Sequence, residues 1–271
     1  GETYVCTDAT TDANVWTNVG SGDGDVVPYN WGGTAYGYMI GGYSANLGVD
    51  RFNIASGTNN VNIGTVTGLV LSPNYGHVYS YHAAGGSSSD THIYGAGGQG
   101  GHGGTHIFGM VSKTQMAASS DSVDSHDLDL ECGELRSCNN RTHAYHMGGE
   151  TVNGGVPQSG YHRDSIQKTT FATDVSSTQT GTLAIETSDG GCCSGPLAGY
   201  KNGIRGNTTG ALQKYVFATD VSATNIGVLS FNNNDRAHTC ASETHGYVQG
   251  GNGSDVIESF LFSNEATQTD V

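Results

Sequence analysis

The chain has 271 residues, among them 43 glycines, 14 tyrosines and only 4 prolines, and its formal net charge is −15. This acidic excess repels phosphate backbones and anionic lipids, which excludes nucleic acids and membrane surfaces as the first partners to consider. No run comes near the roughly 18 apolar residues that a membrane-spanning helix needs. Abundant Gly, Asn and Ser favour an all-β chain of short strands and tight turns.

Residues 1–30 are predicted to form a β-hairpin followed by a linker. The segments 3–8 and 14–19 alternate in polarity and are joined by a polar turn, which is typical of two paired strands. Residues 20–30 are rich in Gly and Asp and contain Pro28, as a linker would be. We expect a separate hairpin module here, with closure of a ring by this segment as the alternative.

Residues 31–271 contain an internal repeat whose clearest element is an aromatic strand that ends in a glycine pair. A fixed period of this kind outranks any local motif in deciding the fold. One copy, residues 199–203, has lost the pair. The full copies are residues 36–42, 91–98, 142–149 and 244–251.

Two further elements follow each glycine pair. The first is a strand with an aromatic residue before a turn, at residues 52–56, 108–112, 169–174, 215–220 and 260–264. Its best copies are the Phe-Ala-Thr-Asp-Val runs that begin at Phe171 and Phe217. The second is a short strand that contains a glycine, at residues 63–66, 132–135, 180–183 and 226–229. A fourth strand is expected before the next glycine pair.

Successive glycine pairs lie about fifty residues apart, close to the kelch period, and four strands in such a unit make one propeller blade. The sequence therefore predicts a kelch-like β-propeller of about five or more four-stranded blades, with the N-terminal hairpin attached. The glycine pair should end the innermost strand where neighbouring backbones approach. The tyrosines should pack between blades, and the phenylalanines should fill the core between sheets.

The last repeat is expected to be incomplete. Alignment of residues 262–271 with residues 217–226 places Val271 on Ile226, just before the expected glycine. On this alignment the last blade stops after its second strand. The missing strands would then come from residues beyond Val271 or from the N-terminal segment.

Three stretches of sequence resemble a known family. Residues 1–20, the Thr-His-Gly-Tyr-x-x-Gly-Gly pattern and the Phe-Ala-Thr-Asp repeats resemble the kelch-like structural proteins of tailed bacteriophages, especially those of marine bacteria. The resemblance implies an appendage or fibre component, located on the virion surface and therefore extracellular. Its implied partners are other virion structural proteins and a host surface glycan. Homo-oligomerisation is compatible with it, because fibre proteins are often oligomers.

The histidines and acidic residues are interpreted as structural, and no metal or cofactor is expected. His92, His143 and His245 share one repeat position, which indicates a common task such as bonding a neighbouring blade's turn. His102 and His106 lie in a glycine-rich loop without a helpful carboxylate or cysteine ligand. The acidic run of Asp124, Asp127, Asp129 and Glu131 lacks the glycine and closing glutamate of a calcium loop. It is better explained as an exposed edge strand.

The six cysteines are too few and too scattered for a disulfide framework. Cys132 and Cys138 could bridge a small loop or remain as free thiols.

We expect no enzymatic activity, because the chain has no nucleophile elbow, Walker loop or zinc-protease motif. Tyr75, Tyr161 and Tyr200 are the candidate ligand contacts, since tyrosines on loops can stack on sugars; packing inside blades is the competing interpretation. A surface-polysaccharide depolymerase is the alternative function, and it would need a pair of carboxylates in a groove. A secreted cellular adhesin is the other alternative.

Overall fold

The computed structural model describes residues 4–9, 15–18, 35–41, 48–58, 60–66, 84–100, 106–153, 156–203, 210–229, 237–251 and 254–270. Over these ranges all regular structure is β-strand, and no helix that could span a membrane is found among them. Contacts divide the chain into Gly1–Gly32 and Gly33–Val271. This division falls two residues after the expected boundary.

The first unit contains the predicted hairpin. Strand β1 (Tyr4–Asp8) pairs antiparallel with β2 (Val15–Asn18), and the hydroxyl groups of Thr7 and Thr17 lie 2.9 Å apart across the pair. The predicted linker, residues 20–30, lies outside the described residues.

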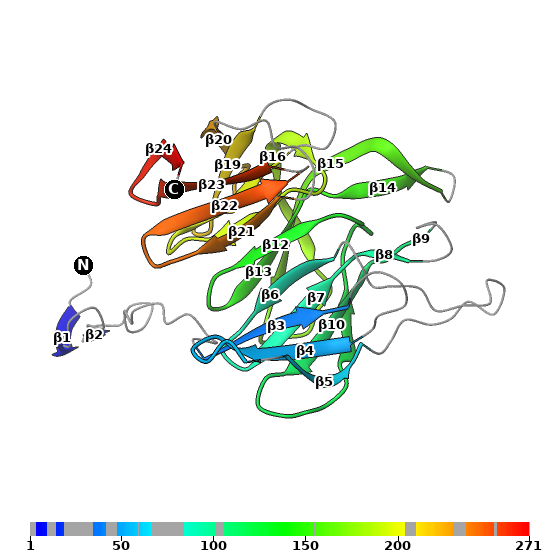
Figure 1. The fold of residues 1–271 in the computed structure, drawn as a ribbon, viewed down its shortest axis with the longest axis horizontal. Helices are drawn as coiled ribbons and strands as arrows, with labels where there is room; N and C mark the ends of the chain where they lie inside the picture. The colour runs from blue at the N-terminus through cyan, green and yellow to red at the C-terminus, as the bar shows by residue number, and fades with distance from the viewer. Residues whose placement is uncertain are drawn as a thin grey trace. The chain divides into compact units, whose positions relative to one another are not determined.

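The second unit confirms the fold, because its described strands form five antiparallel sheets arranged as the blades of a five-bladed β-propeller (Figure 1). Blade 1 consists of β3 (Tyr36–Ile40), β4 (Gly48–Asn53) and β5 (Val61–Thr65). Blade 2 consists of β6 (Gly85–Ser88), β7 (His92–Ala96), β10 (Met110–Gln115) and β11 (Val123–Asp127). A small hairpin of β8 (Gln99–Gly100) and β9 (His106–Ile107) interrupts blade 2.

The remaining three blades each have four main strands. Blade 3 consists of β12 (Arg136–Asn139), β13 (His143–Met147), β15 (Val156–Thr170) and β16 (Thr178–Thr187), and β14 (Glu150–Asn153) pairs with the start of β15. Blade 4 consists of β17 (Cys192–Ser194), β18 (Ala198–Asn202), β19 (Ala211–Val216) and β20 (Thr224–Val228). Blade 5 consists of β21 (His238–Ala241), β22 (His245–Gly251), β23 (Ser254–Leu261) and β24 (Asn264–Asp270).

Two predictions about the repeat are wrong: the position of the tyrosine strand within its blade and the incompleteness of the last blade. The tyrosine strand is the second strand of each four-stranded blade, not the innermost one; β6, β12, β17 and β21 precede it and lie next to one another from blade to blade. Blade 5 is therefore not cut after its second strand, because residues 264–270 complete it as β24. The sequence showed the recurring strands but not where each blade begins.

Blade 2 departs from the predicted positions because the β8–β9 hairpin shifts the spacing of its strands. Its third strand, β10, ends at Gln115, and Met116 directly after it takes the place of Phe171, so residues 108–112 were the wrong match. Its fourth strand includes Ser125 and His126. Residues 132–135 instead form the connection to blade 3.

From blade 2 onward, each blade is held to the next by an aromatic pair. Tyr94 of blade 2 stacks on Phe171 of blade 3 with ring centroids 4.9 Å apart, and Tyr145 stacks on Phe217 of blade 4 at 4.7 Å. Tyr200 stacks on Phe262 of blade 5 at 5.1 Å. These three tyrosines are almost completely buried. The prediction that tyrosines pack between blades and phenylalanines fill the core is confirmed at these three interfaces, whereas Phe52 of blade 1 is exposed.

An ion pair accompanies each of these stacks. The Lys113 ammonium lies 2.8 Å from Asp174, and the Lys168 ammonium lies 2.6 Å from Asp220. Lys214 pairs in the same way with Glu265. Asp174 and Asp220 each end the Phe-Ala-Thr-Asp run with φ of 47°, a conformation that Asp tolerates better than most residues. The repeated motif therefore supplies one ring and one carboxylate to the preceding blade.

Backbone contacts tighten the same interfaces. The amide of Ser177 donates to the carbonyl of Asp127 at 2.9 Å, and the amide of Ala223 donates to Thr182 at 2.8 Å. The first glycine of each pair has positive φ, and an added Cβ on Gly148 would lie 2.4 Å from the carbonyl oxygen of Thr187. The expected close approach of backbones at the glycine pair is confirmed. Blade 4 keeps this glycine as Gly203.

Replacement of Phe217 by Ala should lower the free energy of unfolding by about 3–5 kcal/mol, because the ring is buried and stacked on Tyr145. Urea unfolding measures this loss. Val221→Ala, at an exposed position in the same hairpin, should change stability by less than about 0.5 kcal/mol. Equal effects of the two substitutions would contradict the assigned register.

Gly148→Ala should destabilise the fold by at least about 1–2 kcal/mol, since the residue has φ of 67° and its new methyl group would meet the Thr187 carbonyl. Gly86→Ala is the matched control, because nothing lies within 4 Å of a Cβ added there. Thermal unfolding of both variants compares them. Equal melting temperatures would show that the glycine is not needed for blade packing.

Candidate functional site

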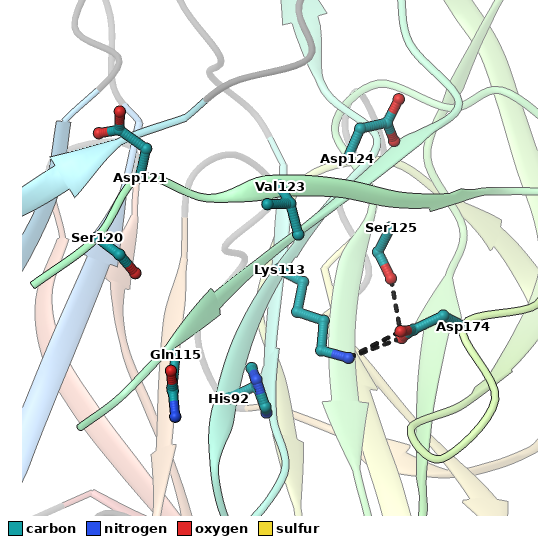
Figure 2. A pocket seen from close by; sticks show the side chains of 9 residues that line it. All are labelled: His92, Lys113, Gln115, Ser120, Asp121, Val123, Asp124, Ser125 and Asp174. Carbon is teal, nitrogen blue, oxygen red and sulfur yellow. Dashed lines mark hydrogen bonds and ion pairs between the residues drawn. The ribbon is translucent and has the colours of Figure 1, made fainter. Parts of the chain in front are cut away.

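A cavity of about 310 Å³ opens on blade 2 and is completed by the turn of blade 3 (Figure 2). The lining side chains come from three strands of blade 2, from the loop before β11 and from the β15–β16 turn. All but one of them are polar or charged. They are His92, Lys113, Gln115, Ser120, Asp121, Val123, Asp124, Ser125 and Asp174.

Asp174 is the centre of one wall of this cavity. Its carboxylate accepts hydrogen bonds from Lys113 Nζ at 2.8 and 3.0 Å and from the Ser125 hydroxyl at 2.9 Å, as Figure 2 shows. Burial alone would raise the pKa of Asp174, but the hydrogen bonds and charge of Lys113 and the hydrogen bond from Ser125 together lower it. The ion pair between blades 2 and 3 is thus also part of the cavity wall.

Two further carboxylates, those of Asp121 and Asp124, belong to the lining of the cavity. Asp121 Oδ1 accepts a hydrogen bond of 2.8 Å from the amide of Thr65, which ties this part of the lining to blade 1. Asp124 is exposed, and partial burial together with the charge of Asp127 raises its pKa. With Gln115 and Ser120 nearby, the cavity offers several acceptors and donors to a polar ligand.

Behind the cavity, a chain of hydrogen bonds leads to two buried histidines. The Ser125 hydroxyl lies 3.0 Å from His126 Nδ1, and His126 Nε2 lies 3.3 Å from the Thr169 hydroxyl. The same hydroxyl lies 3.2 Å from Nε2 of His146, so it can accept from one ring and donate to the other. Burial lowers the pKa of His126, and burial followed by the charge of His126 lowers that of His146 to about 3.

The three predicted ligand contacts do not meet in this cavity. Tyr75 lies outside the described residues, and Tyr161 belongs to β15 but its side chain lies outside the described part. Tyr200 is buried between blades 4 and 5, where its hydroxyl donates to Glu265 at 3.1 Å. The competing interpretation, packing inside the blades, therefore holds for Tyr200. The prediction that Tyr200 contacts a ligand at the surface was wrong.

The repeated histidines have a shared structural task, but the expected partner was wrong. Nδ1 of His92, His143 and His245 lies 2.8 Å from the hydroxyl of the preceding threonine in each case, not from a neighbouring blade's turn. The acidic run begins in β11, which is an exposed edge strand as predicted. His102 and the His106 side chain lie outside the described residues. No group of metal-ligating side chains is found among the residues described.

Cys132, Cys138, Cys192, Cys193 and Cys240 are free thiols. Cys132 lies in the core between blades 2 and 3, and Cys138 lies in the core between blades 3 and 4, so the two thiols belong to different interfaces. Of the two options left open by the sequence, the free thiols are observed. Burial raises the pKa of Cys132 to about 11, which keeps it protonated.

Lys201 is another titratable group that sequence inspection missed. It takes the same place in β18 as His146 takes in β13, and burial lowers its pKa to about 7. Its ammonium donates to the carbonyls of Asp189 and Asn202. Because Lys201 and His146 are both fully buried, neither can touch a ligand in the cavity.

No protein-family model matches this chain, and no curated protein sequence matches it either.

His146 should make stability depend on pH. The unfolded chain binds a proton at this histidine below about pH 6.5, whereas the folded chain does so only near pH 3. Stability is therefore lost as the pH falls from about 6.5 towards 3, by up to about 1.4 kcal/mol per pH unit for this group.

His146→Gln should lose less stability than the wild type between pH 6.5 and pH 4.5, measured by urea unfolding. His238→Gln, which replaces an exposed histidine, is the control and should follow the wild type. Parallel curves for wild type and His146→Gln would contradict the proposed burial of a neutral imidazole.

Proposed function

We propose that this chain is a non-enzymatic structural and binding protein of a bacteriophage virion appendage, whose cavity on blade 2 contacts a host surface glycan. The single observation that carries the binding part is the cavity itself, where polar side chains from separate elements converge. Glycans offer many hydroxyl groups, and carboxylates and amides such as those of Asp121, Asp124 and Gln115 bind hydroxyl groups well.

The construction of the blades supports a scaffold role. The aromatic rings and charged side chains that recur in the repeat lie between blades, where they hold neighbouring sheets together. A strongly shifted pKa can mark a catalytic group. The pKa values of Lys201 and His146 are strongly lowered, but both side chains are enclosed in the core, where a substrate cannot reach them. A rigid platform with a polar surface cavity suits recognition at a virion surface.

The net charge of −15 also favours this class of ligand. Neutral or cationic glycans avoid the repulsion that a polyanion would meet at such an acidic protein. The ligand is thus proposed to be a neutral oligosaccharide of a bacterial envelope, bound through its hydroxyl groups.

Purified protein should bind neutral envelope oligosaccharides on a glycan array, with affinity then measured by calorimetry. Asp124→Ala and Gln115→Ala should each weaken binding by up to about tenfold, because each removes a hydrogen-bonding side chain. Asp164→Ala removes an exposed carboxylate that does not line the cavity and should bind as the wild type does. Binding that none of the cavity substitutions weakens would place the glycan elsewhere.

A second candidate function is hydrolysis of the same class of glycan. Glycosidases need one carboxylic acid with a raised pKa and a second carboxylate, and Asp124 with its raised pKa shares the cavity with Asp121. Release of new reducing ends from envelope polysaccharide, abolished by Asp124→Asn, would replace the binding proposal with this one. Glycan binding without any cleavage keeps the non-enzymatic proposal.

A further inference from the structure

The five blades make four described interfaces, and all use equivalent positions. The interface between blades 4 and 5 shows the pattern most clearly. Blade 5 presents Val248, Phe260 and Phe262, and blade 4 receives them with Cys193, Tyr200 and Leu212; these six residues belong to one hydrophobic cluster. The β-strand registers of the blades identify the equivalent residues elsewhere in the chain.

Blade 1 carries the first half of this pattern, and it is exposed. Met39, Phe52 and Ile54 are equivalent to Val248, Phe260 and Phe262, because Gly37 pairs with Phe52 as Gly246 pairs with Phe260. Their exposed fractions are 51%, 37% and 54%, whereas Val248 and Phe260 are at most 1% exposed. We call Met39, Phe52 and Ile54 the first-blade face.

The local geometry of the first-blade face matches that of a covered face. A Cβ added at Gly37 would lie 2.1 Å from the Phe52 ring, and a Cβ added at Gly246 would lie 2.3 Å from the Phe260 ring. In both blades the missing side chain lets the ring lie across the neighbouring strand. The first blade is thus built like one that packs on a preceding blade.

Blade 5 carries the other half, and it is also open. Cys240, Tyr247 and Ile257 are equivalent to Cys193, Tyr200 and Leu212 and form what we call the last-blade face. Ile257 is 36% exposed, while the four residues at its position in blades 1 to 4 are at most 1% exposed: Val49, Val111, Ile166 and Leu212. The first-blade face does not cover it within the chain, since both faces are exposed.

Charge does not oppose contact between the two faces. The positions of the interblade ion pair are held by Gly57 in blade 1 and Ser259 in blade 5, so neither end presents an unpaired ion there. Asp50, the carboxylate on the first-blade face, accepts hydrogen bonds from Asn60 and Asn62. Its equivalent in β23, Glu258, is only 1% exposed, so an acid is tolerated at this position.

We propose that the first-blade face of one copy packs on the last-blade face of a second copy, head to tail, as blade 5 packs on blade 4. The chain itself supplies both halves of an interface that it already makes between its own blades. Such a heterologous contact joins copies into a closed ring or a filament. The proposal rests on the two faces alone and is independent of glycan binding.

Sedimentation over a wide concentration range tests the proposal, with the wild type expected to form larger species as concentration rises. Ile54→Glu and Ile257→Glu should each be monomeric, because each places a charge on one face. An equal mixture of the two variants should form a dimer and nothing larger, since each variant keeps one working face. Leu197→Glu, at an exposed site on neither face, should assemble as the wild type does.

Circular dichroism should show that both variants fold, because the substituted side chains are exposed in the monomer. A wild type that stays monomeric at every concentration would overturn the proposal. The same result is expected if the two faces pack on each other within one chain, so that case would overturn it too. Assembly of Ile54→Glu by itself, at the concentrations where the wild type assembles, would also overturn it, because that result requires a symmetric contact.

Discussion

The stacking of a tyrosine on the aromatic ring of the following blade is the interaction on which the rest of the structure depends. A single four-stranded sheet of this size has two faces and cannot bury both alone. Tyr145 and Phe217 solve this problem for blades 3 and 4, and the adjacent Lys168 and Asp220 add an ion pair across the same interface. Repetition of the pair at three interfaces gives short, glycine-rich strands a buried hydrophobic cluster between each blade and the next.

The same dependence explains the composition. Glycine is required where a strand ends against the backbone of its own blade, as Gly148 does against Thr187, and where a ring crosses a neighbouring strand, as at Gly246. The cavity depends on an interblade ion pair, because Lys113 and Asp174 hold blades 2 and 3 together and also line the cavity. At the two ends of the array the apolar interblade positions, such as Ile54 and Ile257, are exposed, and these are the positions proposed to contact a second copy.

The repeat, the all-β fold and the roles of tyrosine, phenylalanine and glycine could be predicted because each depends on local spacing. The start of each blade could not be predicted from the sequence. The order in which strands pair is a long-range property, and the same repeat can be divided into blades beginning at either of two strands. The cavity was missed for a related reason: Asp174 is far in sequence from the residues of blade 2 that it meets, 61 residues after Lys113. The aspartate of the Phe-Ala-Thr-Asp repeat, which is Asp174 in blade 3, was the one feature of the sequence that could have pointed to the cavity. Tyr200 was misplaced because a ring that packs between blades and a ring on a loop have the same local pattern.

A double-mutant cycle on Tyr145 and Phe217 tests the central claim most directly. Both residues are changed to Leu, separately and together, and the free energy of unfolding is measured for each protein. If the stacked pair couples the two blades, the combined loss should differ from the sum of the single losses by about 1 kcal/mol. Losses that add to within about 0.3 kcal/mol would show that the rings stabilise their own blades independently and would contradict this account.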